Sequence, residues 1–187
     1  MSRLIVTEFV TLDGVMEAPG GEPTHPHTGW VFDFMSPEQE QYKLNETLEA
    51  ESHLLGRVTY EGFAGAWPQR EGPFADKINS MPKYVVSSTL SEPLEWNNST
   101  VIRGDVAEEV GRLKERDGGP ILVAGSATLV RSLIENDLVD ELRLMVFPVM
   151  IGGGKRPFPE SQQRKAFKPT DTEAFGSGVV VNTYEPA

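Results

Sequence analysis

Arg57 directly follows Gly56, and Thr59 comes two residues later, where a short apolar run ends and a helix is expected to begin. A glycine lets the backbone turn tightly, and the first N–H groups of a helix point outward and favour negative charge. The arginine adds a planar guanidinium suited to phosphate, and the threonine adds a hydroxyl group. These residue types in this order predict an anion-binding site, although the chain carries a net charge of −11.

Three further strand ends carry anion-binding residue types. They are Ser87, Ser88 and Thr89; Arg103, before Gly104 and Asp105; and Gly125, Ser126, Ala127 and Thr128. Taken singly, each set is more often an ordinary turn or helix cap. Together they are more informative, because parallel sheets bind ligands at the carboxyl ends of their strands. We therefore expect an extended ligand with phosphates at two places.

Several other kinds of site are excluded by the motifs. Lys155 follows a glycine but precedes Arg156, so the pattern of a phosphate-binding loop fails, and no G-x-G-x-x-G follows an expected strand. His25 and His27 lie in a proline-rich loop with no obvious third ligand, so no metal site is expected. The absence of cysteine excludes disulfides and thiolate chemistry.

Length and composition indicate one globular domain over residues 1–187. The excess of 28 acidic over 17 basic residues argues against a nucleic-acid partner, which needs a basic face. The first ten residues are too few and too polar for a signal peptide, and no apolar run is long enough for a membrane helix. Together with the missing cysteines, this favours a cytoplasmic location.

Strand and helix patterns alternate along the chain. Strands are expected at 4–9, 54–56, 83–88, 100–103, 121–124 and 142–149, and helices at 36–51, from 58, at 74–79, at 105–118 and after 126. Ser36 with Gln39, and Asp105 with Glu108, form capping boxes at two of these helix starts. The last two strands, 164–174 and 179–185, flank a glycine-rich turn and predict an antiparallel hairpin.

This alternation predicts the α/β class, with a mainly parallel mixed sheet, helices on both faces and a C-terminal antiparallel hairpin. The proline- and glycine-rich loop over residues 18–29 is either a functional lid or a plain insertion. The apolar strand 142–149 and the hairpin could support a homodimer, although such a strand is equally typical of a central core.

The order of several segments resembles the dihydrofolate reductase-like superfamily. Within it, the chain is most similar to the reductase domain of the riboflavin-biosynthesis deaminase–reductase and its stand-alone bacterial relatives. The segments are 11–17, 56–61, 86–90, 125–130, and 138–142 running into Pro148 and 151–155. The resemblance spans nearly the whole chain and implies a three-layer dihydrofolate reductase-like fold.

The resemblance implies NADPH as the cofactor. Arg57 and Thr59, after Gly56, would hold the 2′-phosphate side of the adenosine. Ser87, Ser88 and Thr89 would touch the adenine ribose with Arg103 nearby, and the residues Gly125, Ser126, Ala127 and Thr128 would bind the pyrophosphate. In one departure, Ala124–Gly125 replaces the two glycines that a cis peptide joins in dihydrofolate reductases. Whether this bond is cis is left open by the sequence.

The implied reaction is hydride transfer to a small pterin-, ribosylaminopyrimidine- or flavin-like heterocycle, related to 5-amino-6-(5-phosphoribosylamino)uracil reductase activity. Asp13 matches an aspartate at the substrate site of the riboflavin-type reductases, and Glu17 is a second catalytic candidate. The proton-donating carboxylate of dihydrofolate reductases has no clear match on the first long helix; Asp33 and Glu38 lie nearby.

Five aromatic residues could form the walls of a pocket for a planar substrate. They are Trp30, Phe34, Tyr60, Phe63 and Trp67. Aromatic residues are also common in protein cores, so this assignment competes with a packing role. The alternative function is a nucleotide- or ligand-binding protein that shares the fold and has no catalytic activity.

Overall fold

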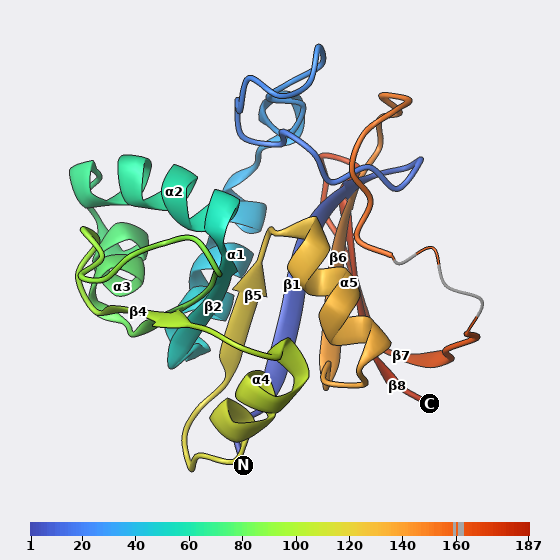
Figure 1. Ribbon diagram of the computed structural model, residues 1–187. Coiled ribbons are helices and arrows are strands. Elements are labelled where there is room, and N and C mark those ends of the chain that lie inside the picture. The colour runs from blue at the N-terminus through green and yellow to red at the C-terminus, as the bar shows by residue number, and fades with distance from the viewer. Residues whose placement is uncertain (159, 161–162) are drawn as a thin grey trace.

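One eight-stranded sheet runs through the computed structural model, which describes residues 1–158, 160 and 163–187 (Figure 1). The strands are β1 (Leu4–Thr11), β2 (Ser52–Gly56), β3 (Lys83–Val86), β4 (Ser99–Ile102), β5 (Ile121–Ala124), β6 (Glu141–Phe147), β7 (Phe167–Ala174) and β8 (Val180–Pro186). Their order is β4-β3-β2-β5-β1-β6-β8-β7. All neighbours from β4 to β6 are parallel, and β8 pairs antiparallel with both β6 and β7. The predicted mixed sheet with a C-terminal hairpin is confirmed.

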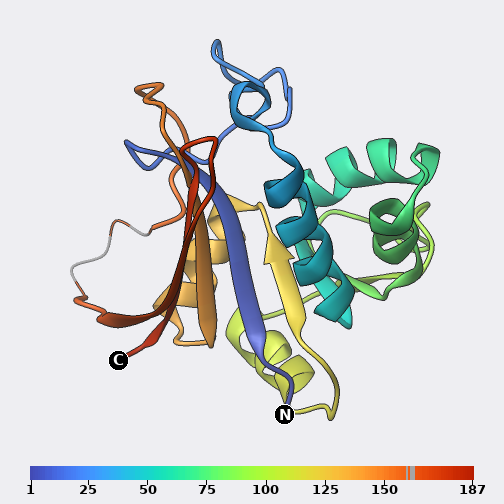
Figure 2. The ribbon, with the colours of Figure 1, turned by 180° about the vertical axis from the view of Figure 1, so that it is seen from behind.

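Helices cover both faces of the sheet. They are α1 (Pro37–Glu49), α2 (Arg57–Ala66), α3 (Pro73–Ser80), α4 (Val106–Lys114) and α5 (Ala127–Glu135), with short 3-10 turns at Phe32–Phe34 and Trp67–Gln69. In Figure 1, α4 and α5 lie in front of the sheet, and Figure 2 shows α1 on the opposite face. This is the three-layer arrangement expected from the sequence.

The N-cap bond of each predicted capping box is present, whereas the Gln39 side chain, expected to complete the first box, accepts from Ser177 Oγ instead. The side chain of Ser36 accepts a hydrogen bond from Gln39 N at 3.4 Å, and Asp105 Oδ1 accepts one from Glu108 N at 3.0 Å. Each bond satisfies an N–H group that a helix start leaves without an intrahelical partner. Helix α1 ends at Glu49, two residues before the expected end, because the backbone of Ala50 is extended.

The alternating side chains of β1 divide the core between the two faces. Leu4 and Val6 pack in the cluster that includes residues of α4 and α5, whereas Ile5 packs against Ala50, at the end of α1. Full burial of such a side chain stabilises the fold by about 1.5–3 kcal/mol. The hydrophobic contacts therefore fix which strand positions face α5.

The strand expected at 142–149 is internal. It corresponds to β6, which lies between β1 and β8, so its apolar residues belong to the core. On the hairpin, β7 is exposed along most of its length, and an irregularity interrupts its pairing between Pro169 and Asp171. The homodimer remains a prediction, and only the hairpin is left at the sheet edge to support it.

His53 of β2 is buried, and its two ring nitrogens have no hydrogen-bond partner among the described residues. Burial first, and then the nearby Lys83 and Lys43 cations, lower the pKa of His53 from 6.5 to about 3. Neutral His53 therefore supports the fold above about pH 6.5, and this contribution is lost as the pH falls toward the folded-state pKa.

The free energy of unfolding of the wild type should decrease between about pH 6.5 and about pH 4. We expect this decrease to be smaller by about 3 kcal/mol in His53→Leu. Urea unfolding curves at several pH values measure this decrease. His27→Asn is the matched control, because His27 lies in an exposed loop. An unchanged acid dependence in His53→Leu would contradict the assignment to His53.

Candidate functional site

The sheet places the four predicted strand ends in one row. Since β4, β3, β2 and β5 are neighbouring parallel strands, their carboxyl ends share one edge. Along it lie Arg103, the hydroxyl segment 87–89, the 56–59 turn and the 125–128 turn. The loop that carries Asp13 follows at the end of β1, the next strand. An extended ligand can therefore contact consecutive strand ends without any rearrangement of the sheet.

The Ser126 hydroxyl joins the turn before α2 to the turn before α5. It accepts a hydrogen bond from Gly56 N at 2.8 Å and donates one to Thr59 Oγ1 at 2.7 Å. Gly125 and Ser126 both have positive φ angles, 75° and 68°. Two helix starts with outward-pointing N–H groups are thus held side by side, which is an arrangement that suits the phosphates of an anionic ligand.

The glycine at position 56 is needed for this close approach. Its φ of −81° is open to other residues, so the tight turn expected from the sequence is not what requires glycine. A Cβ atom at Gly56 would lie 2.5 Å from Ser126 Oγ.

The Ala124–Gly125 bond, which the sequence left open, is trans: among the described residues the cis peptide is Glu92–Pro93.

Arg57 stands at the first position of α2 and forms an ion pair with Glu61, one turn later. Its Nη1 lies 3.0 Å from Glu61 Oε2, and the two side chains are 44% and 49% exposed. Exposed pairs of this kind contribute about 0–1 kcal/mol. A ligand phosphate can therefore compete with Glu61 for the guanidinium at small cost.

Ser87 and Arg103 shape the loop after β3. Ser87 Oγ accepts hydrogen bonds from Thr89 N at 3.2 Å and Leu90 N at 3.0 Å, and the Arg103 guanidinium donates to the carbonyl groups of Ser88 and Leu90. Ser87 is buried, whereas Ser88 and Thr89 are exposed. The two exposed hydroxyl residues are therefore the ones placed to touch a ligand directly.

Asp13 and Glu17, the predicted catalytic residues, hold the glycine-rich segment 152–155. Asp13 Oδ2 accepts from Gly152 N at 2.8 Å, and Glu17 Oε2 accepts from Lys155 N at 2.9 Å. The Thr11 hydroxyl first, and then the Gly152 and Ile151 N–H groups, lower the pKa of Asp13. Asp13 is thus ionised at neutral pH and anchors the backbone of this segment.

The loop over residues 18–29 is tied to the same segment. His25 Nε2 lies 2.7 Å from Gly153 O, and His25 Nδ1 accepts from His27 N at 3.0 Å. Because Nδ1 accepts, Nε2 carries the proton and donates to the carbonyl. The Trp30 indole adds a hydrogen bond to Glu17 O at 2.9 Å. The described residues contain no group of three or more His, Cys, Asp or Glu side chains able to hold a metal ion.

The five aromatic residues proposed as one pocket wall lie in two separate clusters. Trp30 and Phe34 pack against Phe147, with ring centroids 5.2 and 6.2 Å away. Tyr60, Phe63 and Trp67 belong to the other cluster, between α2, α3 and β3. The two groups pack against different strands, β6 and β3, so the structure does not bring them together.

A buried polar network lies between α1 and the sheet, and the sequence patterns did not predict it. Lys43 Nζ donates to Thr7 Oγ1 at 2.8 Å and pairs with Glu46, while Arg143 Nη1 lies 3.3 Å from Glu46 Oε1. Glu8, a buried acid on β1, was missed as well. The sequence signal for Glu8 is a charge inside the apolar strand Leu4–Thr11, away from the strand ends.

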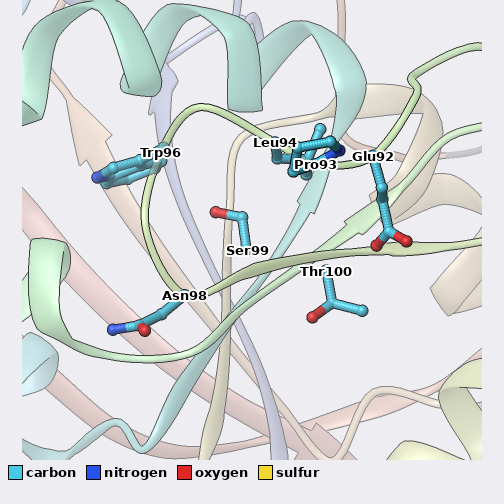
Figure 3. A pocket seen from close by; sticks show the side chains of 7 residues that line it. All are labelled: Glu92, Pro93, Leu94, Trp96, Asn98, Ser99 and Thr100. Atoms are coloured by element: carbon cyan, nitrogen blue, oxygen red, sulfur yellow. The ribbon is translucent and has the colours of Figure 1, made fainter.

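Two surface hollows lie away from this edge. Figure 3 shows one of them, lined by Glu92, Pro93, Leu94, Trp96, Asn98, Ser99 and Thr100. Ser99 and Thr100 begin β4, so this hollow lies at the amino end of that strand, opposite the row of carboxyl ends. The second lies between α1 and β7. Neither is lined by a residue predicted to bind the cofactor, although Glu38, one of the two carboxylates noted near the first long helix, lines the second.

The fold and the row of strand ends define a dihydrofolate reductase-like protein. The chain belongs to the RibD C-terminal domain family, whose model matches residues 2–181. It is 33% identical over 191 residues to YyaP of Bacillus subtilis (strain 168), covering 97% of this chain and 94% of YyaP. YwjB of the same strain is 28% identical over 171 residues, covering 91% and 90% of the two chains.

Solved structures share the fold. A putative riboflavin biosynthesis protein from Shewanella sp. PV-4 aligns with a TM-score of 0.77 at 20% identity, covering 99% of both chains. A pyrimidine reductase-like protein from Corynebacterium diphtheriae gives 0.66 at 12% identity, covering 100% of this chain and 92% of that one. RibD of Acinetobacter baumannii gives 0.68 at 14% identity; all of this chain aligns with 58% of RibD. No helix in the described part of the chain is long and apolar enough to cross a membrane.

Proposed function

We propose that this protein is an NADPH-dependent reductase that transfers a hydride to a small heterocycle of the pterin, ribosylaminopyrimidine or flavin type. Membership of the RibD C-terminal domain family supports a reductase. The observation that carries the proposal is the junction at Ser126, which holds two helix starts together beside the Arg57 guanidinium. Phosphates of a dinucleotide suit such paired N-termini, and a cation at the start of α2 suits an additional phosphate.

We propose that NADPH lies along the row, with its parts in the order of the strands. The N-terminus of α5, after Gly125, would hold the pyrophosphate, and Arg57 with Thr59 would hold the 2′-phosphate. Ser88 and Thr89 would contact the adenine ribose on the loop that Ser87 and Arg103 shape. The bound cofactor would supply the hydride. The guanidinium supplies local positive charge in a chain whose net charge is −11.

On the substrate side, we propose that Asp13 and Glu17 position the 152–155 segment and the loop above it against the nicotinamide end of the site. Their carboxylates already bind backbone N–H groups of that segment. Trp30 and Phe34 close one side of this region as part of the cluster around Phe147. The names of two structural relatives mention riboflavin biosynthesis and a pyrimidine reductase, which favours the ribosylaminopyrimidine class of substrate.

A binding protein without turnover is the second candidate. It is favoured by the engagement of Asp13 in backbone hydrogen bonds and by its lowered pKa, which leave it a poor proton donor. Both candidates predict NADPH binding, and only the first predicts NADPH oxidation.

The test combines a binding measurement with a turnover measurement. Quenching of tryptophan fluorescence by NADPH gives the affinity, and loss of NADPH absorbance with dihydropterins, ribosylaminopyrimidines and flavins gives turnover. We expect binding together with oxidation driven by one substrate class. Tight binding without turnover across the panel would support the binding protein, and absence of NADPH binding would overturn both candidates.

A further inference from the structure

Glu8 is a buried acid directly beneath the start of α5. It lies on β1 between Val6 and Val10, which pack in clusters containing α5 residues, and it is 4% exposed. Its Oε2 accepts a hydrogen bond from Gly125 N at 3.2 Å. Its Oε1 is buried and has no hydrogen-bond partner among the described residues. An unsatisfied buried carboxyl oxygen is costly, so its place at this helix start calls for a reason.

We propose that Glu8 is a positioning residue that carries a proton when a dinucleotide pyrophosphate occupies the N-terminus of α5, so that cofactor binding is coupled to proton uptake. The inference rests on the proposed function, because that function assigns the pyrophosphate to the turn that Glu8 contacts. It extends that function by naming a residue beneath the turn that sets the charge encountered by the cofactor.

The charge balance at the turn explains the coupling. An ionised Glu8 in a low-dielectric interior would repel the two negative charges of a pyrophosphate at the same helix start. A protonated Glu8 removes this repulsion and converts one carboxyl oxygen into a hydrogen-bond donor. The interaction is linked, so the bound anion must favour the protonated form as strongly as protonation favours the anion.

The surroundings of Glu8 allow it to change charge near neutral pH. Burial raises the pKa of Glu8 to about 8, against the opposing Lys43 cation and the Gly125 N–H, while the Glu46 carboxylate adds to the increase. On β6, Arg143 is held between Glu46 and Glu141. A bound pyrophosphate would raise the pKa of Glu8 further.

The sign of the pH effect follows from these directions. Below the pKa of the free protein Glu8 is already neutral, and the affinity for NADPH is at its maximum. As the pH rises through about 8, binding requires uptake of a proton and weakens. We expect the Kd for NADPH to rise about tenfold between about pH 7 and about pH 9.5, and proton uptake to be largest in this range.

Glu8→Gln separates this effect from other titrations. Glutamine keeps the shape of a neutral glutamic acid, so the variant should bind NADPH with a Kd that changes less than about twofold over the same range, and without proton uptake. The pKa of Lys83 is also lowered to about 8 by burial, but Lys83 lies on β3, where its ammonium donates to three backbone carbonyls. Its titration is retained in Glu8→Gln.

The experiment is a calorimetric titration with NADPH in two buffers that differ in ionisation enthalpy, at several pH values. Wild type, Glu8→Gln and the exposed control Glu40→Gln are compared, and thermal unfolding verifies that each variant is folded. Proton uptake in wild type and Glu40→Gln, and its loss in Glu8→Gln, would support the inference. NADPH binding by wild type without proton uptake would overturn it even if Glu8→Gln did not fold.

Two further outcomes distinguish the inference from the proposed function. An identical pH dependence in wild type and Glu8→Gln would remove the role of Glu8 and leave the proposed function intact. Absence of NADPH binding by wild type at every pH would overturn both.

Discussion

Arg57→Ala is expected to weaken NADPH binding about 10- to 100-fold and to leave NADH binding nearly unchanged. The guanidinium at the start of α2 is the cation proposed to hold the 2′-phosphate, which NADH lacks. Its present partner is the exposed carboxylate of Glu61, 3.0 Å away, so the side chain is already oriented by a weak contact. Fluorescence titrations with both dinucleotides measure the change in preference.

Arg112→Ala is the matched control for this experiment. Arg112 forms exposed ion pairs with Glu108 and Glu109 on α4, so its removal takes away the same kind of contact at a residue that is not part of the proposed site. Equal loss of NADPH and NADH affinity in Arg57→Ala would indicate a damaged turn. Unchanged affinity for both would remove Arg57 from the site.

Gly56→Ala is expected to weaken NADPH binding at least tenfold and to destabilise the protein by about 1–3 kcal/mol. The added methyl group would lie 2.5 Å from Ser126 Oγ and 2.9 Å from Ser126 Cβ, closer than atoms can approach. Ser126 must then move, and the bond from Gly56 N and the bond to Thr59 are lost together. The affinity and the midpoint of urea unfolding are the two measurements.

Gly62→Ala makes the same chemical change, but here we expect the opposite effect on stability. Gly62 lies within α2, and a Cβ atom there meets no atom within 4 Å. Alanine inside a helix should therefore raise the stability by about 0.5–1 kcal/mol and leave NADPH affinity unchanged. If Gly56→Ala bound NADPH as well as Gly62→Ala does, the Ser126 junction would have no part in cofactor binding.

These predictions share a physical basis: an acidic protein is proposed to bind an anion. The net charge disfavours the ligand at long range, so affinity must come from short-range donors placed at strand ends. In the proposed site, the N–H groups of two adjoining helix starts and the Arg57 guanidinium would be these donors. A neutral Glu8 beneath the turn would leave no buried negative charge there to repel the anion.

The amino-acid sequence by itself determined the elements, their alternation and the positions of the candidate donors. Apolar periodicity located the strands and helices, and local side-chain caps such as those of Ser36 and Asp105 marked two helix starts, because both signals act over a few neighbouring residues. Because parallel strands present their carboxyl ends at one edge, the sequence also predicted that the candidate residues lie along one edge of the sheet, as the strand order shows.

Tertiary structure alone decided which of these residues meet. Strand order brings Ser126 against Gly56, 70 residues away, and brings Asp13 against Gly152, 139 residues away. The same order separates Trp30 from Trp67 and turns Glu8 toward the start of α5. Such contacts depend on the packing of all eight strands at once, and no local pattern in the chain encodes them.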